Sequence, residues 1–210
     1  MNSENATVCI VDDDPSVRKA LVRAVQTAGL RAKPFASARE FLDQPPPEGP
    51  VCLVLDILMP GLNGLELQVE LNSRNIEIPI IFITGHGTVP MSVKAMKRGA
   101  LDFLTKPFKV ANLLGLIQEA LHKDASRQIA RAATADLQRR CQALTPRERE
   151  VLDLVVKGLS NKQIASELGA AERTIKVHRG RVMKKMQVVS VADLVRAVEQ
   201  LKLERDRPPS

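Results

Sequence analysis

Short apolar runs alternate with amphipathic segments over the first 121 residues. The runs occupy residues 7–11, 32–35, 51–56, 78–83 and 101–105. The unbroken run at 51–56 is typical of a strand that is buried on both faces of a sheet, and the others are short strand patterns. Apolar residues at helical spacing follow each run, in 15–28, in a short stretch after Ser37, and in 65–73, 90–98 and 109–121. Five strands, each followed by a helix, predict an α/β fold with a doubly wound, five-stranded parallel sheet.

The pattern becomes helical throughout after residue 142. Thr145 and Glu148 have the spacing of a capping box, and Pro146 stands at the first helical position. Ser160 then opens a short helix, which Gly169 ends, and a tight turn leads into residues 172–186. This order predicts a small all-α helix-turn-helix domain.

Residues 122–142 join the two patterned regions and are rich in Ala, Arg, Gln and Asp. We expect a solvated helical linker that continues the preceding helix, with or without a break. A coiled coil would need three or four sustained heptads, which this stretch lacks. The predicted boundaries are therefore 5–121 for the α/β domain, 122–142 for the linker and 143–205 for the helical domain.

The segment 172–186 has one basic face and one apolar face. At 100° per residue, Arg173, Lys176, Val177, Gly180 and Lys184 fall within an arc of about 100°. Ile175, Val182 and Met186 fall on the opposite side and are expected to pack. A solvated surface usually mixes both signs of charge, whereas a face that reads a DNA groove needs cations and an apolar contact for the thymine methyl group.

Charge is distributed unevenly between the two halves of the chain. The net charge is +7, but residues 1–123 carry 13 basic and 13 acidic side chains, while residues 143–210 carry 14 and 9. A basic second half suggests a polyanionic partner, although a solvated basic face would give the same count. The N-terminus is polar and no apolar run is long enough to span a bilayer, so we expect a cytoplasmic protein with no membrane partner.

Candidate chemistry gathers where the predicted strands end. Asp12 and Asp13, Asp56, Thr84 and Lys106 each follow or close a different strand, and a doubly wound sheet brings such ends to one crevice. Asp56 alone could be a turn-forming residue. Three clustered carboxylates, however, suit Mg²⁺, and together with a lysine and a hydroxyl they could receive a phosphoryl group.

The first 120 or so residues resemble the receiver domain of two-component response regulators, a flavodoxin-like fold. The resemblance rests on Asp12, Asp13, Asp56, Met59-Pro60, Gly64, Thr84, Phe103 and Lys106-Pro107. It implies that Asp56 is the phosphoacceptor, and that Asp13, Asp56 and the carbonyl of Leu58 bind Mg²⁺ directly while Asp12 acts through water. It also implies that Thr84 and Phe103 form a switch pair and that the Lys106–Pro107 peptide bond is cis.

The second half resembles the LuxR-type helix-turn-helix at 144–150, 158–165 and 174–179, so the whole chain resembles the FixJ/NarL class of response regulators. DNA contacts are then expected from Asn161, Lys162, Arg173, Thr174, Lys176, Val177, His178, Arg179 and Lys184. His178 and Arg179 flank the packed side, which favours packing or phosphate contacts over base contacts. Ala171 stands where the family often has a Ser cap, and Gly180 offers no side chain to a base.

The resemblance implies a transcription regulator that is not an enzyme, beyond slow hydrolysis of its own aspartyl phosphate. Its expected partners are a sensor histidine kinase as phosphodonor, a second copy of the chain after phosphorylation, double-stranded promoter DNA and RNA polymerase. Two alternatives are a constitutive DNA binder and a phosphohydrolase with an aspartyl nucleophile. The second would need a cap insertion, for which the sequence has no room.

Overall fold

The computed structural model describes residues 5–85 and 89–205, which form two compact units. The first unit ends at Gln128 and the second begins at Ile129. Each unit has a hydrophobic core of its own. No helix within these described ranges is both long enough and apolar enough to cross a lipid bilayer.

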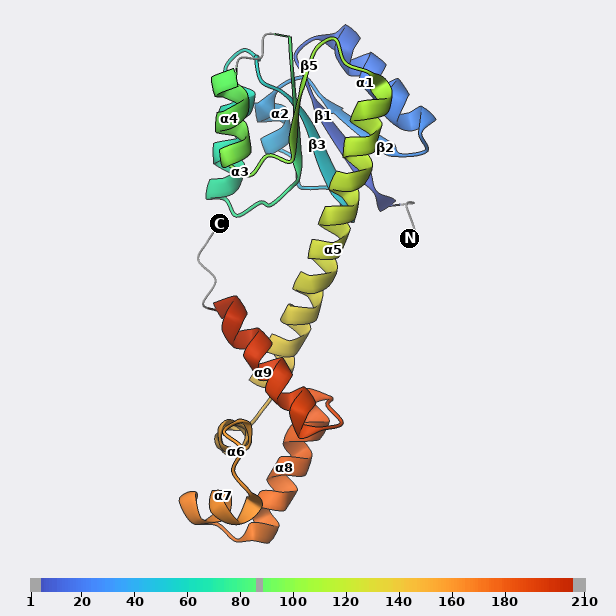
Figure 1. Cartoon of the computed structure of the whole chain (residues 1–210). Helices are drawn as coiled ribbons and strands as arrows, with labels where there is room; N and C mark the ends of the chain where they lie inside the picture. The colour runs from blue at the N-terminus through green and yellow to red at the C-terminus, as the bar shows by residue number, and fades with distance from the viewer. Residues whose placement is uncertain (1–4, 86–88, 206–210) are drawn as a thin grey trace. The chain divides into compact units, whose positions relative to one another are not determined.

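A five-stranded parallel sheet forms the centre of the first unit (Figure 1). Its strands are β1 (Thr7–Val11), β2 (Arg31–Phe35), β3 (Val51–Asp56), β4 (Ile80–Thr84) and β5 (Asp102–Thr105). They lie in the order β2-β1-β3-β4-β5, and every neighbouring pair is parallel. The predicted doubly wound α/β fold is confirmed, and β3 lies in the middle of the sheet.

Helices cover both faces of this sheet (Figure 1). One core packs α2 (Ala38–Leu42), α3 (Gly64–Ser73) and α4 (Val89–Lys97) against alternate strand residues such as Val11 and Leu55. The other core packs α1 (Pro15–Thr27) and the first turns of α5 (Val110–Gln142) against their neighbours Ile10 and Val54. Because successive residues of a strand point to opposite faces, a strand covered on both sides has to be apolar throughout.

Helix caps and one glycine determine the conformation of the loops at the carboxyl ends of β1 and β3. Asp14 caps α1 by accepting hydrogen bonds from the amides of Ser16 and Val17, and Pro15 follows it as predicted. Asn63 and Glu66 form a capping box at the start of α3 that the sequence pattern did not suggest. A Cβ atom on Gly64 would lie 2.3 Å from the carbonyl oxygen of Asp56, so only glycine allows the loop to fold back onto this strand end.

Helix α5 is continuous over 33 residues, so it has no break in the predicted linker. The expectation of a solvated linker is wrong for part of it. Asp124 is 4% exposed and accepts hydrogen bonds from Val51 N (2.9 Å) and Gln128 Nε2 (2.8 Å). It thereby satisfies the backbone amide at the amino end of β3. Thr134 is buried as well, whereas residues 128–133 are all exposed.

The second unit is all-helical, as predicted. Helices α6 (Pro146–Val156), α7 (Asn161–Glu167) and α8 (Glu172–Met186) form the helix-turn-helix region, and α9 (Val191–Arg205) follows (orange to red in Figure 1). Thr145 with Glu148 and Ser160 with Gln163 form capping boxes at the starts of α6 and α7. The apolar face of α8, namely Ile175, Val182 and Met186, is fully buried in this core.

Candidate functional site: a carboxylate cluster and a basic helix

Three carboxylates meet at the carboxyl end of the sheet. Asp12 follows β1, Asp56 ends β3, and one oxygen from each of Asp12, Asp13 and Asp56 lies within 4.8 Å of the others. Asp12 is fully buried and Asp56 is 7% exposed, while Asp13 is open to solvent. The predicted convergence of these strand ends is therefore observed.

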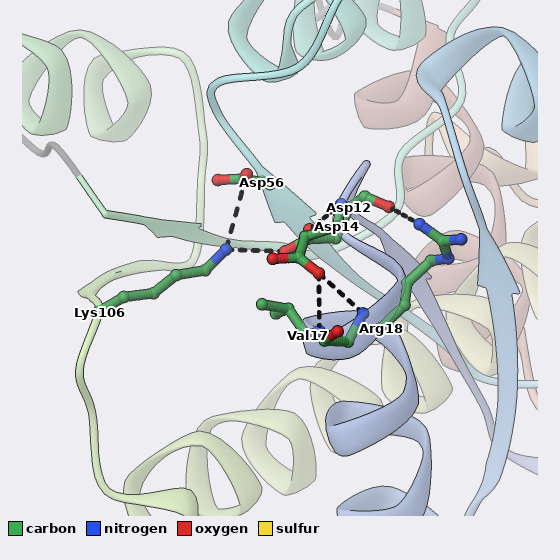
Figure 2. Close-up of polar contacts among 7 residues, drawn as sticks. Asp12, Asp14, Val17, Arg18, Asp56 and Lys106 are labelled. Carbon is green, nitrogen blue, oxygen red and sulfur yellow. Dashed lines mark hydrogen bonds and ion pairs between the residues drawn. The ribbon is translucent and has the colours of Figure 1, made fainter.

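Lys106, which follows β5, points into this cluster (Figure 2). Its Nζ lies 2.7 Å from Asp12 Oδ2 and 3.6 Å from Asp56 Oδ2. Asp56 Oδ1 is buried and has no hydrogen-bond partner among the described residues. One oxygen of the central carboxylate is thus left free for a further ligand or a reaction.

Burial raises the pKa of Asp56 above its ordinary value, and the charge of Asp12 adds to this effect. Lys106 and the backbone amides of Ile57 and Leu58 act in the opposite direction. Three carboxylates and only one lysine leave the cluster with excess negative charge, which a divalent cation would relieve. The oxygen ligands and the unpaired Asp56 Oδ1 fit Mg²⁺.

The other predicted residues of this site surround the cluster. Thr84 ends β4 and is fully buried, and Phe103 lies on β5 and is partly buried against the core. The side chain of Leu58 is 49% exposed beside Asp56. The Lys106–Pro107 peptide bond is cis, as expected.

Arg18 belongs to the site, although no sequence pattern pointed to it. Its Nη1 donates a 2.6 Å hydrogen bond to the carbonyl oxygen of Asp12 (Figure 2). Asp14 N donates to Asp12 Oδ1 at 2.9 Å. These two bonds hold the backbone carbonyl group and the side chain of Asp12 in place.

The basic face of α8 is exposed as predicted. Arg173, Thr174, Lys176, Gly180 and Lys184 are open to solvent, and Val177 is 49% exposed. Lys162 on α7 is exposed as well. A large apolar side chain among cations is suited to contact with a thymine methyl group in a groove.

The side chains of Asn161 and Arg179 are hydrogen-bonded to each other. Arg179 Nη1 donates a 2.9 Å hydrogen bond to Asn161 Oδ1 and thereby joins α8 to the first residue of α7. His178 is partly buried, and its Nδ1 has no hydrogen-bond partner among the described residues. Both findings agree with the expectation that these two positions of α8 flank the packed side.

Two contacts at the carboxyl end of α8 were not predicted. Lys185 Nζ lies 2.6 Å from Glu148 Oε2, and this hydrogen bond, with that from Thr145 N, holds the pKa of Glu148 below its ordinary value. Arg140 of α5 donates to the carbonyl oxygen of Met186, the last residue of α8. The exposed basic helix is therefore held at its end by neighbours distant in sequence.

Comparison with known proteins agrees with both halves of this description. Residues 8–118 match the response regulator receiver domain, and residues 142–198 match the bacterial regulatory proteins of the luxR family. Nodulation protein W of Bradyrhizobium diazoefficiens is 50% identical over 95% of this chain and 88% of its own length. Transcriptional regulatory protein FixJ of Rhizobium meliloti is 43% identical over 90% of this chain and 93% of its own length.

Solved structures give the same result. The response regulator StyR has a TM-score of 0.87 at 48% identity, with 93% of this chain and 99% of that chain covered. Full-length FixJ from B. japonicum has a TM-score of 0.56 at 39% identity, with 94% and 97% covered. The similarity therefore extends over both units of the chain.

Proposed function

The chain belongs to the FixJ/NarL class of two-component response regulators, which are DNA-binding transcription regulators controlled by phosphorylation, and we propose how its own residues carry out this function. We propose that Asp56 is the phosphoacceptor. An Asp56 oxygen attacks the phosphorus of a phosphohistidine on a sensor histidine kinase, the P–N bond breaks and the imidazole leaves. The unpaired Asp56 Oδ1 and the nearby Lys106 support this assignment, because a lysine at this place can neutralise phosphoryl oxygens.

We propose that Asp13, Asp56 and the carbonyl group of Leu58 hold Mg²⁺, with Asp12 acting through water. The metal would supply positive charge for the oxygens of the transferred group. Asp12 is suited to an indirect role, because its two oxygens already accept hydrogen bonds from Asp14 N and Lys106. The exposed carboxylate of Asp13 is suited to bind the metal directly.

We propose that Thr84 and Phe103 pass the change at Asp56 to the surface. Thr84 lies one strand away from Asp56 at the same edge of the sheet, since Asp56 pairs with Ile83. Inward movement of Thr84 toward the phosphoryl group would let Phe103 turn and promote assembly of two copies of the chain. Moving such an equilibrium from mostly off to mostly on requires about 5.5 kcal/mol.

For DNA binding, we propose that α8 enters the major groove. Arg173, Lys176, Val177 and Lys184 would face the bases and phosphates, with Lys162, Thr174 and His178 near the backbone. Asn161 and Arg179 would act through the hydrogen bond that they share. Bound at promoter DNA in the cytoplasm, the dimer would contact RNA polymerase. Any hydrolysis of its aspartyl phosphate would be slow and would not make the protein an enzyme.

The unpaired oxygen of Asp56 beside Lys106 is the observation that carries this proposal, and phosphoryl incorporation tests it. The protein is incubated with Mg²⁺ and radiolabelled acetyl phosphate, a small phosphodonor. We expect one labelled group per chain, which alkali removes, and none in the Asp56→Asn variant. Equal labelling of this variant would assign the phosphoryl group to another residue. Many rapid turnovers of the donor would favour a phosphohydrolase instead.

A further inference from the structure

The amide group of Gln68 holds one end of the neighbouring helix. Gln68 lies on α3 and is 1% exposed. Its Nε2 donates to the carbonyl oxygens of Ala95 (3.1 Å) and Arg98 (3.2 Å), at the carboxyl end of α4. Asn72, one turn further along α3, donates to Arg98 O at 3.3 Å. Helices α3 and α4 lie side by side (Figure 1), and two amides join them at one end.

Packing alone does not account for a glutamine at this position. Gln68 Oε1 is buried and has no hydrogen-bond partner in the part of the chain that the structure describes. A buried amide oxygen without a partner is unfavourable, and an apolar side chain of similar length would avoid it. The two hydrogen bonds from Nε2 offset the cost of burying Oε1 without a partner.

Among the residues of α4 whose side chains the structure describes, few pack in the core: Ala95 is buried and Met91 is partly buried. Val93 and Met96 are each 45% exposed. By contrast, α3 buries Leu67 and Leu71 in addition to Gln68. Because hydrophobic stabilisation scales with the apolar area removed from water, polar contacts account for a larger share of the attachment of α4.

The place of α4 in the chain links it to the proposed switch. It lies between β4, which ends at Thr84, and β5, which contains Phe103. Because the helix is joined along the chain to both strands, it is placed to respond when either residue moves. A fixed carboxyl end limits how the helix can move, and a switch requires an element with discrete arrangements.

We propose that Gln68 is a positioning residue of the phosphorylation switch, which fixes the carboxyl end of α4 so that a change at Thr84 shifts this helix between two discrete arrangements. The inference rests on the proposed function, since it needs a phosphoryl group at Asp56. Gln68 contacts neither that group nor DNA and acts through α4.

The test uses Gln68→Met in the full chain, which keeps the length of the side chain and removes both donors. The variant is expected to fold, because Ala95 O still accepts from Arg98 N and Ala100 N, and Arg98 O still accepts from Asn72. Two quantities are measured: hydrogen exchange of the amides in α4, and DNA affinity with and without acetyl phosphate and Mg²⁺. We expect faster exchange at the carboxyl end of α4, and a ratio of the two affinities that falls by about fivefold or more.

Matched variants separate this role from a purely structural one. Glu70→Gln, on the exposed side of α3, should leave both quantities unchanged, and Asn72→Ala should change both in the same direction but less. Asn72→Ala also carries the test if Gln68→Met does not fold. Faster exchange with an affinity ratio within about twofold of the wild type would overturn the switch role. Unchanged exchange would overturn the attachment itself. A wild-type protein that does not respond to acetyl phosphate would instead contradict the proposed function.

Discussion

The Lys106 ammonium group donates a 2.7 Å hydrogen bond to Asp12 Oδ2, although the two residues are 94 positions apart in sequence. Asp56 Oδ1 has no hydrogen-bond partner within residues 5–85 and 89–205. The lysine therefore balances part of the charge of the carboxylate cluster without bonding to this oxygen, and we expect a measurable consequence for metal binding.

Lys106→Met should bind Mg²⁺ more tightly than the wild type and accept a phosphoryl group more slowly. Removing a cation from the cluster strengthens its attraction for a divalent ion, on the order of tenfold, since one charge at such a distance contributes about 1 kcal/mol or more. Titration calorimetry measures the affinity, and Lys109→Met, at an exposed neighbouring position, serves as the control. Unchanged Mg²⁺ affinity would show that Lys106 does not share the charge of the metal site.

The Arg179–Asn161 hydrogen bond should support DNA binding without a contact to phosphate. We expect Arg179→Ala and Asn161→Ala each to weaken binding, and the double variant to bind no worse than either one. Residues in contact typically show coupling of about 0.5 to 3 kcal/mol in such a cycle. The slope of log affinity against log salt concentration should not change. A slope smaller by about one unit in Arg179→Ala would mean instead that this guanidinium neutralises a phosphate.

Two neighbouring residues of α8 should differ in what they contribute. Lys176→Ala should weaken binding to all sequences, whereas Val177→Ala should relax sequence preference, because an apolar contact to thymine would be lost. Footprinting and competition with mismatched sites, each costing about 1 to 3 kcal/mol in the wild type, distinguish the two effects. Lys202→Ala on α9 is the control. Unchanged footprints in both α8 variants would mean that another helix enters the groove.

The Lys185–Glu148 pair should make the stability of the DNA-binding unit depend on pH. The pKa of Glu148 lies below its ordinary value of 4.5, so the stabilisation is complete above that value and is lost as the pH falls through the lower value of the folded state. Lys185→Met should lower the free energy of unfolding by about 1 to 3 kcal/mol at pH 7. The difference from the wild type should shrink in acid.

Circular dichroism is the appropriate probe of that unfolding, because the chain has no Trp or Tyr. Lys157→Met, which removes an exposed lysine at the end of α6, is the control variant. A difference between Lys185→Met and the wild type that stays constant from pH 7 to pH 3 would show that the pair does not depend on the charge of Glu148.

The sheet and its reactive end could be predicted because they depend on local patterns. Unbroken apolar runs identified buried strands such as 51–56, and parallel topology then brought Asp12, Asp13, Asp56 and Lys106 together. The faces of α8 followed from its helical period in the same way. In each case a short-range regularity determined where a side chain would lie.

Contacts between residues that are distant in sequence produce no such short-range pattern. The bonds of Gln68 to α4, Asp124 to Val51, and Arg179 to Asn161 join residues 18 to 73 positions apart. Each involves a polar side chain whose partner no short-range pattern indicates, and Asp124 lies in the stretch that was expected to be a solvated linker. Only the folded structure shows which polar residues of a helix face a neighbouring backbone and which face water.

We propose that phosphorylation of Asp56 controls the DNA affinity of this chain. The most direct measurement is the affinity for a promoter site at fixed salt concentration, with and without acetyl phosphate and Mg²⁺, in the wild type and in Asp56→Asn. The wild type should bind roughly 5- to 150-fold more tightly with the donor, the usual range for coupled sites, and Asp56→Asn should not respond. An equal response of both proteins, or of neither, would show that phosphorylation of Asp56 does not control DNA binding.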